Sequence, residues 1–339
     1  MSKALQENLN ILFKTWCGEE LHKITPLAKS GSNRKYYRLI GKSETAIGVY
    51  NHNEKENIAF LTFAEHFLKK GLPVPKVYQY DLANNIYIQE DLGDNTLFDL
   101  LQKEGFSVKV EKYYEQALTQ LLKFQIEAGK DLDYTVCYPR DKFDEQSILW
   151  DLNYFKYYFL KLADIQFDEQ KLEDDFQSFK NFLLEAETNY FMYRDFQVRN
   201  IMIKNEQLYF IDFQGGRKGA LQYDPASLIW SARANLSFLQ REDLLNYYFD
   251  ELNKRIKIND KEFKKYYYGY VLIRILQTLG AYGFRGYYER KEHFLKSIPF
   301  ALNNIKWLLE NCKLDLSLNE LISALNKLLK KDFDKKIME

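Results

Sequence analysis

The sequence is poor in the residues that build disulfides and zinc sites. Its only cysteines, Cys17, Cys137 and Cys312, lie far apart and form no CxxC motif. An odd number of widely spaced cysteines favours free thiols in a reducing cytosol over disulfide bonds. The four histidines show no spacing typical of metal ligands, which argues against a zinc site.

The sequence also lacks an excess of either charge, because 48 Lys and Arg residues balance 48 Asp and Glu residues. A chain of balanced charge has no general electrostatic attraction to nucleic acid or to an anionic membrane. We therefore expect neither of these partners, and the sequence identifies no protein partner.

Targeting and membrane-spanning segments are likewise not apparent. The first ten residues, MSKALQENLN, lack the basic and then apolar pattern of a signal peptide. The most apolar stretch, residues 266–284, is interrupted by Arg274 and Gln277, which predicts a buried helix and not a membrane span. These features predict a cytoplasmic protein.

What is present is a β-rich beginning and a helical remainder. Alternating patterns and turn residues predict strands at residues 22–29, 35–40, 45–51, 76–80 and 86–90, with a helix at 56–70. Helical patterns then dominate, at residues 111–128, 149–163, 176–187, 261–279 and 301–311. We expect an α+β chain with a small β-rich N-lobe (1–91) and a large, mostly helical C-lobe (92–339), joined tightly at residues 91–95.

One segment, between residues 190 and 213, interrupts the helical patterns of the sequence. Two apolar runs flank a polar turn near Asn205-Glu206, which predicts a hairpin. Pairing about that turn places residue 200 opposite residue 212, so Asn200 and Asp212 should lie side by side. Their oxygen atoms are ligands that Mg²⁺ accepts.

Asp195, five residues before Asn200, completes a set of groups suited to phosphoryl transfer. One carboxylate accepts the proton of the attacking hydroxyl, while an amide and a second carboxylate hold metal against the phosphates. The spacing Asp-x4-Asn followed by a strand-borne Asp-Phe is similar to the catalytic segments of kinases. The alternative is a solvated hairpin with polar ends.

Three segments carry a resemblance to a known family. Residues 193–202 (YRDFQVRNIM), 212–214 (DFQ) and 223–228 (YDPASL) resemble the aminoglycoside phosphotransferase and choline kinase superfamily. Within it, the DFQ segment and the pair Arg199-Asn200 are most similar to the bacterial anomeric kinases of N-acetylmuramate and N-acetylglucosamine. The similarity also takes in residues 30–39, 89–97 and 284–299.

The resemblance implies a protein-kinase-like two-lobed fold with the active site in the cleft. It implies Asp195 as the catalytic base, Asn200 and Asp212 as Mg²⁺ ligands, and ATP or GTP as the donor. Residues of the loop before the second strand would cover the phosphates, and backbone groups at the lobe junction would hold the nucleotide base. These cofactor-binding residues are Ser30, Gly31, Ser32, Asn33 and Arg34 in the loop, and Glu90 and Leu92 at the junction.

The sequence departs from the family pattern at two positions. Tyr193 stands where the family has a histidine that supports the catalytic loop. The third strand, residues 46–50, has no lysine for the α- and β-phosphates, and neither a Gly-rich loop nor a Walker motif is present. Arg34 or Arg38 could supply the positive charge, although solvation at the surface would explain both residues equally well.

Several arginines are candidates for binding the acceptor. The resemblance places Arg199 and Arg217 near the substrate, and the segment 283–291 adds Arg285 and Arg290, which are suited to gripping a carboxylate. Solvated loop charges and a basic turn between helices are the alternatives. From residue 225 to the end, 20 Lys and Arg outnumber 14 Asp and Glu, which favours a neutral or anionic sugar over a polycationic aminoglycoside.

Asp224-Pro225 predicts a helix start with Asp224 as its N-cap and Pro225 at the first helical position.

Taken together, the sequence predicts a Mg²⁺- and ATP-dependent kinase of a small molecule. The expected acceptor is a sugar hydroxyl, such as the anomeric hydroxyl of an N-acetylated amino sugar. A kinase of another small alcohol or of an aminoglycoside, and a nucleotide-binding pseudokinase, remain the alternatives.

Overall fold

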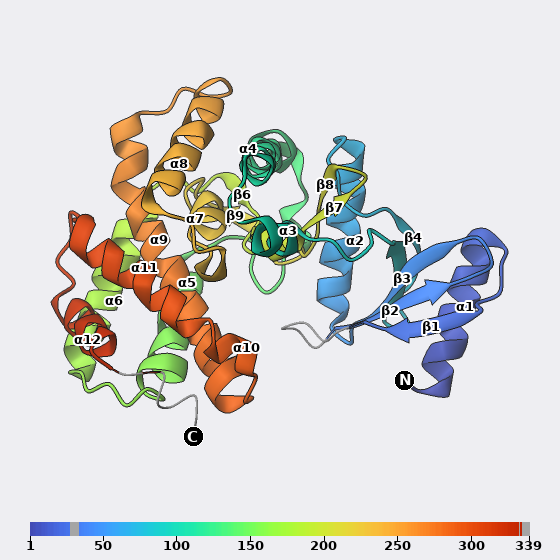
Figure 1. Cartoon of the computed structure of the whole chain (residues 1–339), viewed down its shortest axis with the longest axis horizontal. Coiled ribbons are helices and arrows are strands. Elements are labelled where there is room, and N and C mark those ends of the chain that lie inside the picture. The colour runs from blue at the N-terminus through green and yellow to red at the C-terminus, as the bar shows by residue number, and fades with distance from the viewer. Residues whose placement is uncertain (28–33, 332, 334–339) are drawn as a thin grey trace.

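The computed structural model describes residues 1–27, 34–331 and 333, and it contains a sheet with two helices beside a larger helical part (Figure 1). Five antiparallel strands form the sheet in the order β1-β2-β3-β5-β4. They are β1 (Lys23–Pro26), β2 (Lys35–Ile40), β3 (Thr45–Tyr50), β4 (Val77–Asp81) and β5 (Ile86–Glu90). All five strands expected from the sequence are confirmed; residues 28 and 29 of the first lie outside the described ranges.

Two helices cover the two faces of the sheet. Helix α2 (Glu54–Lys69) forms where a helix was expected, and its buried Phe60 and Phe63 belong to one core with Ile47 and Val49 of β3. On the other face lies α1 (Lys3–Cys17), which was not predicted. Its buried residues are spaced one helical turn apart and pack against the outer side of β2, β3 and β5; they are Leu9, Leu12 and Phe13.

The helical part is organised around one long helix, α9 (Asp260–Tyr282), which is buried on nearly all sides between α5, α7 and α11. The apolar stretch at 266–284 is therefore a core helix, as expected, and no helix formed by the described residues is long and apolar enough to cross a membrane. The other helices are α3 (Leu97–Glu104), α4 (Val108–Leu122), α5 (Glu145–Phe155), α6 (Glu169–Leu184), α7 (Tyr223–Ile229), α8 (Phe238–Asn253), α10 (Glu292–Leu295), α11 (Ile298–Asn311) and α12 (Asn319–Leu329).

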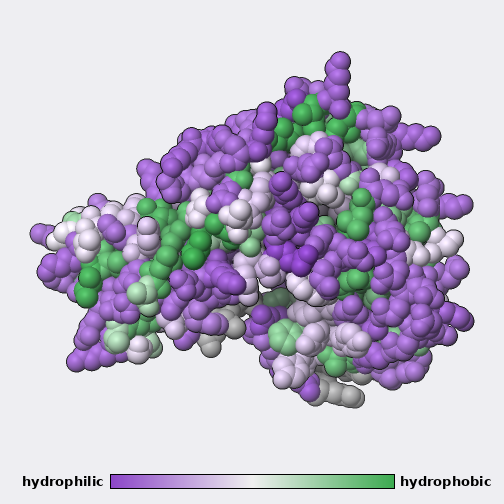
Figure 2. Space-filling view, turned by 180° about the vertical axis from the view of Figure 1, so that it is seen from behind, coloured by the Kyte–Doolittle hydropathy of each residue, from purple (hydrophilic) through white to green (hydrophobic). Residues whose placement is uncertain are grey.

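The surface between the sheet and the helical part is hollowed. Seen from behind, hydrophilic side chains border this hollow (Figure 2). Two short antiparallel strand pairs lie on its helical side: the hairpin of β7 (Ile201–Lys204) and β8 (Gln207–Phe210), and the pair of β6 (Tyr190–Met192) and β9 (Arg217–Gly219), which flank the hairpin in the chain. The segment between residues 190 and 213, which interrupts the helical patterns of the sequence, thus forms part of the wall of the cleft.

Candidate active site

The catalytic hairpin forms as expected, but its register differs by one residue. Ile201 lies opposite Phe210, and the N–H of Ile211 donates to the carbonyl of Asn200 at 3.0 Å. The expected pairing of residue 200 with residue 212 is therefore wrong. A two-residue turn, in which Asn205 and Glu206 both have positive φ, centres the hairpin between these two residues.

Asp212 nevertheless meets Asn200. A slip of one residue would by itself turn a side chain to the other face of a hairpin. Asp212, however, lies beyond the end of β8 and has a φ of 68°, so its side chain is redirected. Asn200 Nδ2 lies 3.4 Å from Asp212 Oδ2, and the two expected metal ligands are adjacent.

The oxygen atoms at this point fit Mg²⁺. Asn200 Nδ2 also donates to the carbonyl of Asp195 at 2.9 Å, which leaves the amide oxygen as a ligand. Gln214 Nε2 donates to Asp212 Oδ1 at 2.6 Å, while Gln214 Oε1 is buried without a partner among the described residues. In the described part of the chain no three His, Cys, Asp or Glu side chains gather around one point. Mg²⁺ needs only one or two carboxylates beside water and substrate phosphates, so this sparse set suits it.

Asp195 lies in the cleft, where an arginine orients it. Its side chain is 41% exposed, and Oδ1 accepts a hydrogen bond from Arg274 Nη2 at 3.3 Å. Arg274 is itself buried in α9, and its Nε donates to Ser227 Oγ at 2.9 Å. One carboxylate oxygen of Asp195 is thus fixed from the core of the helical part.

Buried polar contacts brace the loop that carries Asp195. The N–H groups of Tyr193 and Arg194 donate to the two carboxylate oxygens of Asp224 at 2.7 and 2.9 Å. Arg194, which has a φ of 80°, forms a buried ion pair with Asp151 at 2.6 Å. Several independent contacts therefore hold an uncommon backbone conformation in place.

The structural role expected for Asp224 is present, but its predicted position is wrong. Gln222 is the N-cap of α7, and Asp224 and Pro225 are its second and third residues. Asp224 caps the catalytic loop instead of its own helix. Burial raises the pKa of Asp224 to about 7, against the lowering effect of the two N–H groups that it accepts. The Tyr193 hydroxyl donates to the carbonyl of Ile211 at 2.8 Å and so ties the loop to the hairpin.

A pocket beside Asn200 and Asp212, the two expected metal ligands, has the composition of a nucleotide-base site. Ile47 and Tyr87 of the sheet face Met202 and Ile211 of the hairpin across it. Glu90 and Leu92, expected to hold the base, both line this pocket at the junction of the two parts. Ser30, Gly31, Ser32 and Asn33 lie outside the described residues.

The two arginines considered for the missing lysine lie in different places. Arg34, 7% exposed, donates to Glu56 at 2.8 Å and to Asp212 at 3.1 Å. Arg38 donates to both Asp91 and Asp94 at the junction, at distances of 2.7–3.1 Å. Of these two arginines, only Arg34 therefore contacts Asp212, one of the expected metal ligands.

The arginines expected at the acceptor differ in their surroundings. Arg217 is buried in the wall of the same cleft as Asp195, and its Nε donates to the carbonyl of Gly215 at 3.0 Å. No carboxylate of the described residues pairs with it, and burial together with the nearby Arg194 lowers the pKa of Arg217 to about 10. Arg199 also lines the cleft.

The segment that follows α9 contributes less than expected. Arg285 lines the cleft, but it pairs with Glu289. Arg290 is exposed and is not among the described residues that line the cleft. The structure thus brings Arg199, Arg217 and Arg285 to the cleft of Asp195 and leaves Arg290 outside it.

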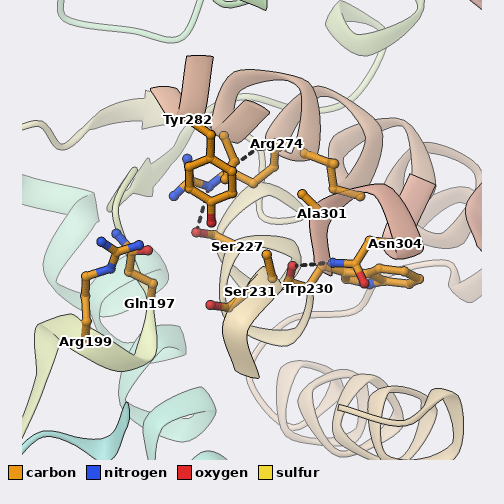
Figure 3. Close-up of a pocket in the computed structure, with 12 residues that line it drawn as sticks. Gln197, Arg199, Ser227, Trp230, Ser231, Arg274, Tyr282, Ala301 and Asn304 are labelled. Carbon is orange, nitrogen blue, oxygen red and sulfur yellow. Dashed lines mark hydrogen bonds between the residues drawn. The ribbon is translucent and has the colours of Figure 1, made fainter. Parts of the chain in front are cut away.

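A small pocket opens beside Asp195 between α7, α9 and α11 (Figure 3). Arg274 lies between this pocket and Asp195. Its lining includes Gln197, Ser227, Ser231, Asn304, Trp230 and Tyr282, and its volume of about 20 Å³ has room for a water molecule but not for a sugar.

Sequence reasoning missed Arg274, Glu56 and Gln214. Arg274 had left a signal, because it is a cation in the middle of an otherwise apolar helix and such a charge needs a buried partner. Glu56 lies in the first turn of α2, where an acidic residue is also favoured by the helix dipole, so its second role was hidden.

Comparison with known proteins places these features in context. A model of the phosphotransferase enzyme family matches residues 23–257. The chain is 22% identical over 306 residues to an N-acetylmuramate/N-acetylglucosamine kinase of Pseudomonas putida, an alignment that covers 87% of this chain and 86% of that protein. A protein of the same name from Neisseria meningitidis is 22% identical over 246 residues, covering 69% and 70%.

Two solved structures are similar over most of the chain. Choline kinase LicA from Streptococcus pneumoniae matches with a TM-score of 0.59 and 14% identity, covering 90% of this chain and 99% of that one. The ADP-bound aminoglycoside phosphotransferase APH(2'')-Ib matches with a TM-score of 0.56 and 15% identity, covering 90% and 98%. At such identities the likeness shows the fold, and it confirms the expected protein-kinase-like architecture.

Proposed function

Because the chain belongs to the phosphotransferase enzyme family, we propose that it transfers the γ-phosphoryl group of Mg²⁺-bound ATP to a hydroxyl group of a sugar. The family and its kinase-named relatives show a phosphotransferase that acts on an alcohol group of a small molecule. The observation that carries the proposal is that Asp195, Asn200 and Asp212 line one cleft, in a chain that resembles kinases throughout.

The residues of the cleft suit the separate tasks of phosphoryl transfer. Asp195 would receive the proton of the attacking hydroxyl at Oδ2, while Arg274 holds Oδ1. Asn200 and Asp212 would hold Mg²⁺, which neutralises charge on the phosphates when it is bound. The brace of the catalytic loop keeps these groups in one geometry, and so it lowers the entropy cost of aligning them.

The proposed donor pocket lies at the junction of the N-lobe (1–91) and the C-lobe (92–339). Glu90 and Leu92 would present backbone groups to the base of ATP, or of GTP as the alternative donor. Support comes from the ADP-bound relative of the same fold. Residues 30–33 would cover the phosphates.

We propose an N-acetylated amino sugar as the acceptor, phosphorylated at its anomeric hydroxyl. The curated relatives are named as kinases of two such sugars. The wide cleft that contains Asp195 has a volume of about 680 Å³ and offers amide, hydroxyl and aromatic groups, among them Gln277, Thr278 and Tyr154. An anomeric hydroxyl is also more acidic than an ordinary alcohol, and so it requires a weaker base.

The proposal is tested by measuring ADP release from purified protein with ATP, Mg²⁺ and a panel of acceptors. The panel contains N-acetylglucosamine, N-acetylmuramate, glucose, choline and an aminoglycoside. Phosphorus and proton NMR of the product should show a phosphate coupled to the anomeric proton. A 3- or 6-phosphate would contradict the anomeric assignment alone. Turnover of choline or of the aminoglycoside without turnover of any sugar would contradict the acceptor class.

A further inference from the structure

The cation that usually binds the nucleotide phosphates is missing from its strand. Kinases place a lysine on the third strand and pair it with a glutamate of the following helix. Here β3 presents Ile47 and Val49 toward α2, and both belong to the apolar core together with Phe60. Glu56 of α2, in contrast, is present and faces the cleft.

We propose that Arg34, immediately before β2, replaces this lysine and binds the polyphosphate of the nucleotide. The inference rests on the proposed nucleotide-dependent function. Arg34 Nη2 donates to Glu56 Oε2 at 2.8 Å, and Arg34 Nη1 donates to Asp212 Oδ1 at 3.1 Å. Its guanidinium thus bridges the helix glutamate and the proposed metal ligand, between which the phosphates of a bound nucleotide would lie.

Neighbouring residues hold the guanidinium in position. Glu56 Oε2 also accepts a hydrogen bond from Asn51 Nδ2 at 3.1 Å, and the N–H of Glu56 is capped by Asn53. Arg34 is 7% exposed and lines the same cleft as Asp212. A side chain fixed in this way loses little entropy when it binds an anion. A planar guanidinium can also hold a carboxylate and a phosphate at the same time, which a single ammonium group does less well.

The other cations near the pocket do not meet these conditions. Arg38, on β2, makes bidentate contacts with Asp91 and Asp94 at the junction and does not line the cleft among the described residues. Arg199 lines both the proposed base pocket and the cleft of Asp195, but it is exposed, and no carboxylate of the described residues holds it in place. Arg34 is therefore the cation placed to act on the phosphates.

The test compares ligands that differ only in their phosphates. Calorimetric titrations with adenosine, ADP and ATP, each with Mg²⁺, are made on the wild type, Arg34→Met, Arg34→Lys and the control Arg290→Met, which removes an exposed arginine outside the cleft. We expect Arg34→Met to weaken ADP and ATP binding about 10- to 100-fold, as loss of a charged hydrogen bond does, and to leave adenosine binding unchanged. Arg34→Lys should recover part of the affinity, and Arg290→Met should bind all three ligands like the wild type.

Each result decides a separate question. If Arg34→Met binds ADP and ATP as the wild type does, or loses adenosine binding equally, Arg34 is not the phosphate cation. If the wild type binds none of the three, the proposed function fails and not only the role of Arg34. Thermal unfolding checks that each variant is folded. Should Arg34→Met not fold, Arg34→Gln, which also removes the charge, replaces it in the same comparison.

Discussion

At the scale of single residues, the carboxylate of Asp195 is the proposed acceptor of the proton. Replacing it in Asp195→Asn keeps the shape and removes the proton acceptor, so kcat should fall about 10²–10⁴-fold. Steady-state kinetics with the best acceptor measure this change. Binding of ADP should stay the same, because the base contacts the acceptor and not the donor.

Glu145 provides a matched control for Asp195. It is an exposed carboxylate that pairs with Lys180 away from the cleft. Glu145→Gln should leave kcat within about twofold, since Glu145 does not line the cleft of Asp195. Near-normal turnover of Asp195→Asn would remove Asp195 from its assigned role.

The pair Asn200 and Asp212 should act as one unit. Asn200→Ala and Asp212→Ala should each raise the Mg²⁺ concentration needed for the half-maximal rate, because each removes one ligand of the same ion. The double variant should lose less than the sum of the two losses in free energy, which a double-mutant cycle measures. Independent effects, or a rate that does not depend on Mg²⁺, would contradict the shared site.

Arg217 should distinguish an acidic acceptor from a neutral one. It is a buried cation without a carboxylate partner among the described residues, so an anionic substituent would supply the missing counter-charge. N-acetylmuramate and N-acetylglucosamine differ by one acidic side group. Arg217→Met should raise KM for the acidic sugar more than for the neutral one, by a factor corresponding to about 1.5–3 kcal/mol.

Arg290 and Arg285 serve as controls for Arg217. Arg290→Met should change neither KM, because Arg290 is exposed outside the cleft. Arg285→Met should have an intermediate effect, since Glu289 already neutralises Arg285. Equal changes in the two KM values for Arg217→Met would assign it to structure and not to the acceptor.

At the scale of elements, sequence patterns predicted those helices and strands whose regularly spaced apolar residues also make the packing contacts. Phe60, Phe63 and Phe67 repeat at helical spacing and are all buried, so α2 was evident. Helix α1 was missed although its sequence carries a signal, because Leu5, Leu9, Leu12, Phe13 and Trp16 recur at helical spacing and gather in one apolar cluster.

The catalytic hairpin shows where prediction from sequence reached its limit. Its two strands and its turn were predicted, whereas its register was not. The proximity of Asn200 and Asp212 depends on the positive φ of Asp212, which no pattern of side chains reveals. The ion pair between Arg274 and Asp195 joins residues 79 positions apart, so the apolar surroundings of Arg274 signal that it has a partner but do not identify that partner.

The π-helical segment Gly283–Tyr288, which continues α9, should be sensitive to a single methyl group at its first residue. A Cβ at Gly283 would lie 1.7 Å from the carbonyl oxygen of Tyr158, whereas a Cβ at Gly215 would meet nothing closer than 3.9 Å. Gly283→Ala should therefore lower the free energy of unfolding by about 1–3 kcal/mol or more, as overpacking does. Denaturant titration measures the free energy of unfolding, with Gly215→Ala as the control. Equal stabilities of the two variants would show that the segment at Gly283 can shift without cost.

At the scale of the whole molecule, a bound nucleotide would contact both parts of the chain. Tyr36 and Tyr87 of the sheet and Asn200 and Met202 of the hairpin line one pocket, so a ligand there should stabilise the folded state as a unit. At a concentration of 100 times Kd, ADP with Mg²⁺ should add about 2.7 kcal/mol to the free energy of unfolding. EDTA should remove most of this gain, because the phosphates would lose the ion that joins them to Asp212.

The same measurement separates an enzyme from a nucleotide-binding module that has lost catalysis. Both would be stabilised by ATP and Mg²⁺, but an enzyme should lose the ATP signal and acquire the ADP signal only when the acceptor is added. Asp195→Asn offers the decisive comparison, because it should retain the stabilisation by ATP and abolish its consumption. If the wild type behaves as Asp195→Asn does with every acceptor of the panel, the cleft binds nucleotide without turning it over. A chain that keeps a base, an arginine that orients it and two metal ligands in one cleft is expected to give the opposite result.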